Sequence, residues 1–329
     1  MNRGEPLLFA LAGSRTYGSA LAQAMAAPLA ALEERTFEDG EHKTRPLAEV
    51  SGRDVYVVHS LHGDAHESVN DKLVRLLFVL AAVKDGGAAR VVAVCPYLAY
   101  ARKDRRTRPL DPVTVRYVAA LFEASGVDCV VTMDAHNQAA FENAFRCRTI
   151  HLEAAPLFVD HFRAMLRSGP VTVVSPDAGG MKRSEAFRVE LQRALGREVG
   201  AAFAEKYRND DVVSGEALVG QVRGATAIIV DDLINAGTTL ARATAACRQA
   251  GADRVFAAAT HGVLVPESDA VLAASGIDAM AISDTIPIWR AIDPRLVASL
   301  AVVSTVRFMA EALTCLNEDR PMPSDVVST

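Results

Sequence analysis

The chain has 329 residues, room for two domains of about 150 residues, so each domain can hold a sizeable core. It contains 35 Lys and Arg residues against 40 Asp and Glu residues, a formal net charge of −5. This acidic balance disfavours nucleic-acid binding and binding to an anionic membrane, because both require a positive field.

The five cysteines are scattered and include no C-x-x-C pair. That spacing argues against a zinc ribbon and is typical of reduced thiols, so we expect a cytoplasmic protein. The apolar runs are too short, or too interrupted by charges, to predict a signal peptide or a membrane span.

Short apolar runs recur along the chain, and each has the length of a buried strand. Their apolar character is continuous, as expected for parallel strands covered by helices on both faces. Between them lie segments with helical periodicity that end in Gly. The pattern predicts an α/β fold with strands at LLFALA, DVYVVHS, RVVAVCP, DCVVTMD, VTVVSPD, TAIIVDD, RVFAAAT and DAMAISD.

The two halves of the chain resemble each other. Each contains a strand followed by a proline and a basic loop, and then a strand that ends in an aspartate. This repetition predicts duplicated domains over residues 1–155 and 156–329. The polar, Pro-rich tail from about residue 317 is expected to be loosely ordered.

The histidine-rich segment HSLHGDAHES follows the second predicted strand. The spacing of His59, His62 and His66 resembles that of a metal site, but no Cys or Glu-x-x-His pair lies nearby in the sequence. We therefore expect no dedicated metal site in this segment.

The stretch IIVDDLINAGTTLARA places two adjacent carboxylates, Asp231 and Asp232, at the end of a predicted strand. Ligands of open α/β sheets bind beyond the carboxyl ends of strands, and paired carboxylates suit the vicinal hydroxyls of a sugar or a hydrated Mg²⁺. The turn that follows can direct backbone N–H groups at an anion, and it consists of Asn235, Ala236, Gly237, Thr238 and Thr239. A pentose on the aspartates with its 5-phosphate in the turn fits the whole stretch, whereas an ordinary Asp helix cap needs only one carboxylate.

This pattern resembles the 5-phosphoribosyl-1-diphosphate (PRPP) site of type I phosphoribosyltransferases and of ribose-phosphate pyrophosphokinases. Further motifs follow the order and spacing of the second family: TFEDGE, PYLAYARKD, VTMDAHN, SPDAGGMKR and EKYR. The chain therefore resembles the ribose-phosphate pyrophosphokinase family over residues 7–310. The resemblance implies two tandem phosphoribosyltransferase-like domains, each a mostly parallel sheet flanked by helices.

The resemblance also implies a reaction. It is the Mg²⁺-dependent transfer of the β,γ-diphosphoryl group of ATP to the 1-hydroxyl of ribose 5-phosphate, which yields PRPP and AMP. Such a transfer depends on positioning and on neutralising charge, and little covalent chemistry falls to the protein. Ribose 5-phosphate is expected in the C-terminal domain, on Asp231, Asp232 and the turn at residues 235–239.

For the nucleotide, the resemblance implies a site on the N-terminal domain. Phe37 is expected against adenine, Asp39 and Glu41 are expected to read the base, and Arg102 and Lys103 are expected to bind the nucleotide. The alternative for TFEDGE is a polar hairpin with Phe37 in the core. Because the family uses this hairpin across a subunit interface, we expect a homo-oligomer.

For catalysis, the resemblance implies that Lys206 and Arg208 neutralise the transition state from a lid that closes over the polyphosphate. His136 and Asp177 are matched to Mg²⁺ ligands. One imidazole and one carboxylate are few for a Mg²⁺ site, so waters and phosphate oxygens are expected to complete the coordination.

Three departures from the family pattern bear on regulation. Asn235 and Ala236 stand where many members carry Asp and Thr, the basic loop after Tyr100 is shortened, and the C-terminus lacks a Ser-aromatic ending. Phosphate binding should survive, since backbone donors do most of that work. Allosteric control by ADP and phosphate, with its hexamer, is not expected; a dimer is as compatible with the sequence as a larger assembly.

Two other functions would use parts of the same pattern. A phosphoribosyltransferase that consumes PRPP would use only residues 228–243 and leave the duplicated half without a role. A non-catalytic regulatory member of the family should have lost lid cations or metal ligands, yet both sets are present. The preferred nucleoside triphosphate is not decided by the sequence.

Overall fold

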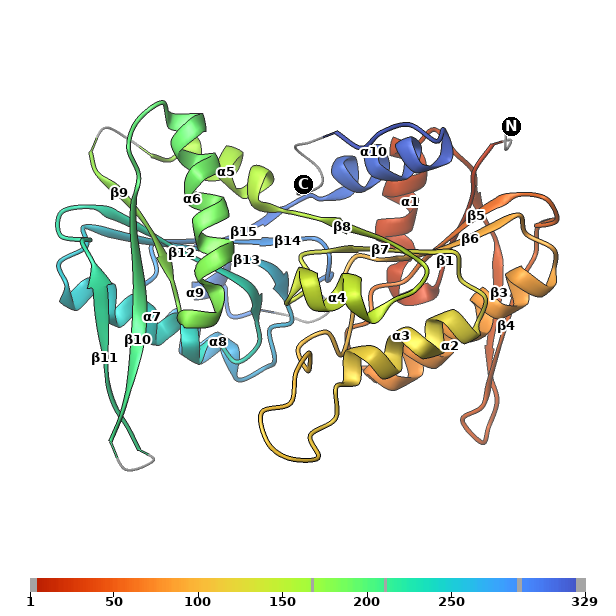
Figure 1. Cartoon of the computed structure of the whole chain (residues 1–329), viewed down its shortest axis with the longest axis horizontal. Helices are drawn as coiled ribbons and strands as arrows, with labels where there is room; N and C mark the ends of the chain where they lie inside the picture. Colours follow the sequence, from red (N-terminus) through yellow and green to blue (C-terminus); the bar gives the residue numbers. More distant parts are fainter. Residues whose placement is uncertain (1–4, 167–168, 210–211, 289–291, 324–329) are drawn as a thin grey trace. The chain divides into compact units, whose positions relative to one another are not determined.

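The computed structural model describes residues 5–166, 169–209, 212–288 and 292–323, with only the backbone described for 205–209 and 212–217. It confirms the α/β class, because the chain forms two compact units that are each built on a mostly parallel sheet (Figure 1). Within the described residues, no helix is long and apolar enough to cross a membrane.

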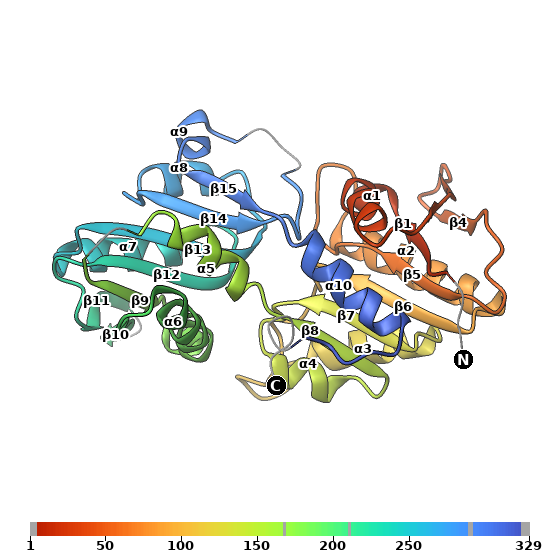
Figure 2. The ribbon, with the colours of Figure 1, turned by 90° about the horizontal axis from the view of Figure 1, so that it is seen from above.

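The sheet of the first unit is parallel throughout and has the strand order β2-β1-β5-β6-β7-β8. Helices α1 and α10 cover one face, whereas α2 and α3 cover the other (Figures 1 and 2). A separate hairpin, β3 with β4, pairs with no other described strand. The elements are β1 (Leu7–Ala10), α1 (Arg15–Ala24), β2 (Leu29–Ala30), β3 (Leu32–Thr36), β4 (His42–Pro46), β5 (Asp54–Val58), α2 (Val69–Asp85), β6 (Arg90–Cys95), α3 (Thr114–Ala124), β7 (Cys129–Met133), α4 (Gln138–Ala144), β8 (Arg148–Leu152) and α10 (Val306–Asn317).

The apolar runs explain this sheet. Strands β5, β6 and β7 are buried along their whole length, which requires apolar side chains on both faces. Helix α2 supplies much of the cover on one face, through Leu76, Val79 and Leu80. It begins at Ser68, whose hydroxyl accepts the N–H of Asp71 while the Asp71 carboxylate accepts the N–H of Ser68. This capping box fixes where α2 starts and therefore which face it buries.

The sheet of the second unit has the order β11-β10-β9-β12-β13-β14-β15 and is parallel except for the β10–β11 pair. On β13, Phe256 stacks on Phe162 of α5, and its neighbours Val255 and Ala257 lie in the core cluster that contains α7. Successive residues of a strand face opposite sides, so both faces are covered. The elements are α5 (Ala155–Arg163), β9 (Val171–Ser175), α6 (Met181–Leu195), β10 (Gly200–Asn209), β11 (Val212–Gly220), β12 (Thr226–Ile234), α7 (Thr238–Gln249), β13 (Arg254–Gly262), α8 (Ser268–Ala273), β14 (Ala279–Ser283), α9 (Pro294–Val297) and β15 (Leu300–Val303).

The expected division at residues 1–155 and 156–329 differs from the structure at the C-terminal end. The units divide between Glu153 and Ala154, but of the described residues 285–288 and 305–323 return to the first unit. Helix α10 is held there by Arg90, whose Nη2 donates to the carbonyl oxygen of Leu316 at 2.9 Å and also to the buried Asp54. The expected loose tail begins at the end of this helix, and residues 318–323 form no helix or strand.

Candidate active site

The strand order of the second unit's sheet defines where a ligand is expected to bind. Strands β9 and β12 are neighbours, yet β9 continues through α6 to β10 on one side and β12 continues through α7 to β13 on the other. Such a switch in strand order is where open α/β sheets bind ligands, beyond the carboxyl ends of the strands. Of the predicted residues, Asp177 follows β9, and Asp231 and Asp232 belong to β12.

Asp231 and Asp232 lie within β12 and not after it. The strand pairs with β9 only as far as Ile229, but it continues beside β13 to Ile234. Strand β13 is longer than β9, and its backbone pairs with β12 beyond the end of the apolar run from which the strand was predicted. The two carboxylates therefore stand on a rigid strand at the point where the neighbouring β9 has already ended.

Arg183 joins this pair, a contact that the sequence does not predict. Its Nη1 lies 3.2 Å from Oδ1 of Asp232 and 3.6 Å from Oδ1 of Asp231. The residue belongs to the first turn of α6, directly after the SPDAGG loop. Its position at the end of the quoted motif SPDAGGMKR was the available signal.

The electrostatics of the pair are unequal. Burial raises the pKa of Asp231 well above its ordinary value, and the adjacent Asp232 carboxylate raises it further, against the opposing effect of Arg183. Oδ1 of Asp231 also accepts the N–H of Asp232 at 2.9 Å. A group that donates hydrogen bonds to this pair, such as a sugar hydroxyl, would relieve the repulsion between the carboxylates.

The predicted phosphate turn leads directly into α7. Gly237 is the N-cap of this helix with a φ of 77°, and as a glycine it has no side chain that could cap the first turn. A Cβ at Gly237 would lie 2.8 Å from the side chain of Leu272, so glycine is required here for both conformation and space. Asn235 and Thr238 are exposed beside these uncapped N–H groups, an arrangement that suits an anion.

Asp177, a predicted Mg²⁺ ligand, also organises its own loop. Its Oδ1 accepts the N–H groups of Gly179 at 2.9 Å and Gly180 at 3.1 Å. The hydroxyl of Ser175 donates to the backbone oxygen of Asp177 at 2.6 Å. These hydrogen bonds hold the Asp177 carboxylate against its own loop, just beyond the end of β9.

The predicted lid residues lie on a strand. Lys206 and Arg208 belong to β10, which pairs with β11 in an antiparallel hairpin that has an irregular register between Tyr207 and Arg208. Beyond Phe203 this hairpin has no pairing with β9, and it extends past the rest of the sheet (Figure 1). The side chains of Lys206 and Arg208 lie outside the described part of the structure, so their role stays a prediction.

In the first unit, the TFEDGE segment forms the tip of the β3–β4 hairpin. Phe37 is 38% exposed, which excludes the alternative that it fills the core. The guanidinium of Arg35 lies 4.8 Å from the centroid of its ring. Oδ1 of Asp39 accepts the N–H of Glu41 at 3.1 Å, so the two acidic residues share one tight turn with the exposed ring.

The basic loop after β6 is built around Asp111. Its Oδ2 accepts from Nζ of Lys103 at 2.7 Å and from the N–H groups of Thr107 and Arg108 at 3.0 Å. Hydrogen bonds from Lys103 and Thr107 hold the pKa of Asp111 well below its usual range. Lys103 is therefore committed to the loop in this structure, whereas Arg102 is exposed.

The same loop meets the turn that carries His136. The Nδ2 of Asn137 donates to Asp104 at 2.7 Å, which joins the predicted nucleotide loop to the end of β7. The turn begins at Asp134, whose φ of 37° is unusual for a residue with a side chain. The N–H of Ala135 donates to Nε2 of the buried His151 at 3.0 Å, a contact that the sequence did not suggest. His136 itself is exposed.

Within the described part of the chain, the predicted Mg²⁺ ligands do not belong to a larger cluster of metal-binding side chains. Among the described residues, no group of three or more His, Cys, Asp or Glu side chains is placed to hold a metal ion. Carboxylate oxygens are the protein ligands that Mg²⁺ prefers, and Mg²⁺ usually keeps waters and phosphate oxygens. Asp177 and His136 offer one donor each, and their roles as Mg²⁺ ligands stay predictions.

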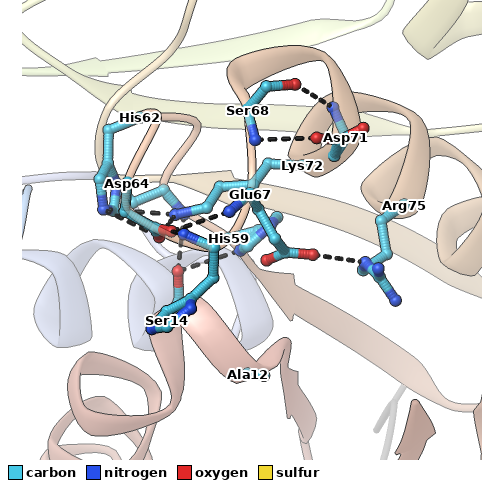
Figure 3. A network of polar contacts seen from close by, with 12 residues as sticks. Ala12, Ser14, His59, His62, Asp64, Glu67, Ser68, Asp71, Lys72 and Arg75 are labelled. Carbon is cyan, nitrogen blue, oxygen red and sulfur yellow. Dashed lines mark hydrogen bonds and ion pairs between the residues drawn. The ribbon is translucent and has the colours of Figure 1, made fainter. Parts of the chain in front are cut away.

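The ammonium group of Lys72 lies among the side chains of the histidine-rich segment. Nζ of Lys72 lies 3.3 Å from Nε2 of His62, and the ammonium donates to Asp64 at 2.5 Å (Figure 3). His59 lies beside them, with its Nδ1 at 3.1 Å from Oγ of Ser14. A buried ammonium beside the imidazoles repels a metal cation, which gives a physical reason for the sequence expectation.

Comparisons with known proteins point to one family. Residues 7–126 match the model of the N-terminal domain of ribose phosphate pyrophosphokinase, and residues 211–324 match the phosphoribosyl synthetase-associated domain. Ribose-phosphate pyrophosphokinase 1 of Streptococcus pyogenes is 32% identical over 323 residues, which cover 98% of both chains.

Two further relatives agree with this. Ribose-phosphate pyrophosphokinase 1 of Streptococcus pneumoniae is 32% identical over 317 residues, which cover 96% of this chain and 95% of the relative. The crystal structure of phosphoribosylpyrophosphate synthetase from Mycobacterium smegmatis superposes with a TM-score of 0.85 at 29% identity, covering 96% of this chain and 100% of the other.

Proposed function

Because this chain belongs to the ribose-phosphate pyrophosphokinase family and is an enzyme of that kind, we propose that it makes PRPP and AMP from ATP and ribose 5-phosphate. The observation that carries the proposal is the second unit's switch point. There, two carboxylates on β12 precede an uncapped helix N-terminus, as a sugar phosphate requires.

Ribose 5-phosphate binds this switch point in the proposal. Asp231 and Asp232 accept hydrogen bonds from the vicinal hydroxyls of the ribose, and the 5-phosphate lies on the N–H groups of residues 235–239. The 1-hydroxyl is then presented on the side of the sheet where β9 ends. Asn235 and Ala236, where many family members carry Asp and Thr, leave the backbone donors unchanged, so phosphate binding is retained.

ATP binds the first unit in the proposal. The exposed ring of Phe37 stacks on adenine, and Asp39 and Glu41 accept hydrogen bonds from its amino group. Arg102 meets the nucleotide as a planar cation. Lys103 would have to leave Asp111 to contact a phosphate, because its ammonium already donates to that carboxylate.

The transfer itself is a displacement at the β-phosphorus of ATP. The oxygen of the ribose 1-hydroxyl forms the new P–O bond, the bond from the β-phosphorus to the bridging oxygen of AMP breaks, and the hydroxyl proton is released. Lys206 and Arg208 stabilise the charge on the phosphoryl oxygens in the transition state. His136 and Asp177 would hold Mg²⁺, which when bound neutralises charge on the polyphosphate.

Two further properties belong to the proposal. The family's use of the TFEDGE hairpin across a subunit interface supports a homo-oligomer, a dimer or larger. The five cysteines are free thiols, four of them buried, which supports a reducing compartment such as the cytoplasm.

An AMP-release assay tests the function. Purified protein receives Mg²⁺, ATP and ribose 5-phosphate, with and without added phosphate, and the Lys206→Ala variant serves as the blank. AMP release that requires ribose 5-phosphate and Lys206 supports the proposal. No release under any of these conditions overturns it and favours a regulatory member, while nucleotide formation from PRPP and a base would indicate a phosphoribosyltransferase.

A further inference from the structure

The β3–β4 hairpin follows β2 directly in the chain but lies outside the main sheet of its unit. It forms a two-stranded sheet of its own, and no other described strand pairs with it. An isolated hairpin of this kind is marginally stable in water. Its position must therefore depend on contacts with helices, and its tip carries Phe37, Asp39 and Glu41.

One set of contacts reaches α2. The Nη2 of Arg75 donates to Oγ1 of Thr36 at 3.3 Å, while the Nε of Arg75 lies 2.8 Å from Glu67 (Figure 3). The ring of His42 stacks on Phe78 with centroids 5.3 Å apart. These contacts hold the ends of the strands next to the tip.

The other contact reaches the start of α1 and comes from Glu34. Its Oε2 accepts the N–H of Ala12 at 3.2 Å, and its Oε1 lies 3.7 Å from the guanidinium of Arg15. Ala12 opens the 3₁₀ turn (Ala12–Ser14) that runs directly into α1. The carboxylate therefore occupies the position that an anion takes at a helix N-terminus.

The surroundings of Glu34 make this contact specific. Its side chain is only 13% exposed, and burial raises the pKa of the carboxyl group above its ordinary value. Oε1 has no hydrogen-bond partner within the described residues, and the cations that act on the carboxylate are Arg75 and Arg15. A buried carboxylate with one oxygen left without a hydrogen bond lowers the stability of the fold. A solvent-exposed side chain at position 34 would therefore favour folding more than Glu34 does.

We propose that Glu34 is a positioning residue, which clamps the hairpin to the N-terminus of α1 so that Phe37, Asp39 and Glu41 are presented in one place. Glu34 acts through the hairpin and does not touch the nucleotide. The proposal rests on the proposed function as far as ATP is concerned, but the clamp itself is a property of the fold.

The neighbouring Glu33 provides a matched control. It lies on the same strand, and its carboxylate pairs with Lys43 at 3.5 Å and Arg45 at 2.5 Å, both within the hairpin. Its side chain is 34% exposed. Removing Glu33 therefore removes a carboxylate from β3 without releasing the hairpin from α1.

The experiment compares Glu34→Ala, Glu34→Gln and Glu33→Ala with the wild-type enzyme. Amide hydrogen exchange of residues 32–46 should quicken about tenfold in Glu34→Ala, because the hairpin opens locally. KM for ATP should rise about tenfold, with kcat and KM for ribose 5-phosphate unchanged. Glu34→Gln, which keeps an acceptor oxygen, should restore part of both effects, and Glu33→Ala should show neither.

The outcomes separate the two proposals. Wild-type exchange in Glu34→Ala overturns the clamp, and so does faster exchange throughout the first unit, since that reports general destabilisation. Equal rises in both KM values also overturn the positioning role. If the wild-type enzyme releases no AMP, the proposed function fails, but the exchange measurement still decides whether Glu34 holds the hairpin.

Discussion

The carboxyl ends of β1 and β5 in the first unit and of β9 and β12 in the second are equivalent places in two similar sheets. Each is a switch point, because neighbouring strands lead to helices on opposite faces. In the second unit the switch point presents two carboxylates and an uncapped helix. In the first it is filled by the buried side chains of Ser14, His59, His62 and Lys72, together with Asp64 (Figure 3).

The helix ends differ in the same way. The N-cap of α7 is a glycine without a capping side chain, whereas the turn before α1 already receives the carboxylate of Glu34. In the first unit, the Lys72 ammonium and the Glu34 carboxylate thus occupy the switch point and the helix start. In the second unit, the N–H groups at the start of α7 are left for a ligand. The same architecture serves as a binding site when its polar groups are left for a substrate, and as a stabilising core when the chain satisfies them.

The largest expected effect concerns the second unit. Lys206→Ala should lower turnover about a thousandfold with little change in ATP affinity, because its contact forms mainly in the transition state. Single-turnover AMP release and ATP binding are the measurements. Lys84→Ala, a lysine that pairs with Asp128 on the first unit, is the control. Unchanged turnover in Lys206→Ala would remove this residue from the mechanism.

A stability change of about 3 kcal/mol is expected for Lys72→Met, since Asp64 then remains as an unpaired carboxylate in a largely buried place. Denaturant unfolding measures it, and the double variant Lys72→Met, Asp64→Asn should recover part of the loss. The KM for ribose 5-phosphate should not change. A large rise in that KM, with stability intact, would show that the first switch point also serves the substrate.

The buried histidines should make stability depend on pH. Burial and the Lys72 ammonium lower the pKa of His59 to about 3 and that of His62 to about 4. In the unfolded chain the two histidines take up protons near pH 6.5, so the stability that comes from burying them neutral is complete above that pH and is lost as the pH falls towards 4. Between pH 7 and pH 5, each histidine should lower the free energy of unfolding by about 2 kcal/mol.

A His62→Gln variant tests this titration. Its unfolding free energy should fall less between pH 7 and 5 than that of the wild-type protein, by the contribution of one histidine. Denaturant unfolding at the two pH values gives the difference. An identical pH dependence in both proteins would show that His62 is not buried as a neutral ring.

The smallest effect is expected at the sugar site. Asp231→Ala should raise KM for ribose 5-phosphate about tenfold and leave KM for ATP unchanged, because hydrogen bonds to the ribose are lost while Asp232 keeps Arg183. Steady-state kinetics with each substrate varied provide the test. A defect confined to ATP would contradict the comparison between the two switch points.

Local patterns were sufficient to predict the α/β class. The runs ending at Val58, Cys95 and Met133 became buried strands because continuous apolar character fits only a covered parallel sheet. The return of α10 to the first unit was not predictable. It depends on Arg90, Asp54 and the carbonyl oxygen of Leu316, whose meeting is set by tertiary structure and leaves no local signal.

The candidate site was predicted unevenly. Asp231, Asp232 and the turn lie together at one switch point, because spacing within a single βα unit is preserved in the fold. Arg183 was missed because its contact with the pair depends on where α6 begins relative to β12. Lys72 was missed for a similar reason, since the capping box at Ser68 determines the face on which it is buried.

The attachment of α10 to the first unit has a consequence for the order of folding during synthesis. The second unit uses chain only as far as residue 304, whereas the first unit also requires α10. Domains generally fold as the chain emerges, the N-terminal one first. Here the half that is synthesised first is completed only after the second unit has been synthesised, because α10, one cover of its sheet, follows the second unit in the chain.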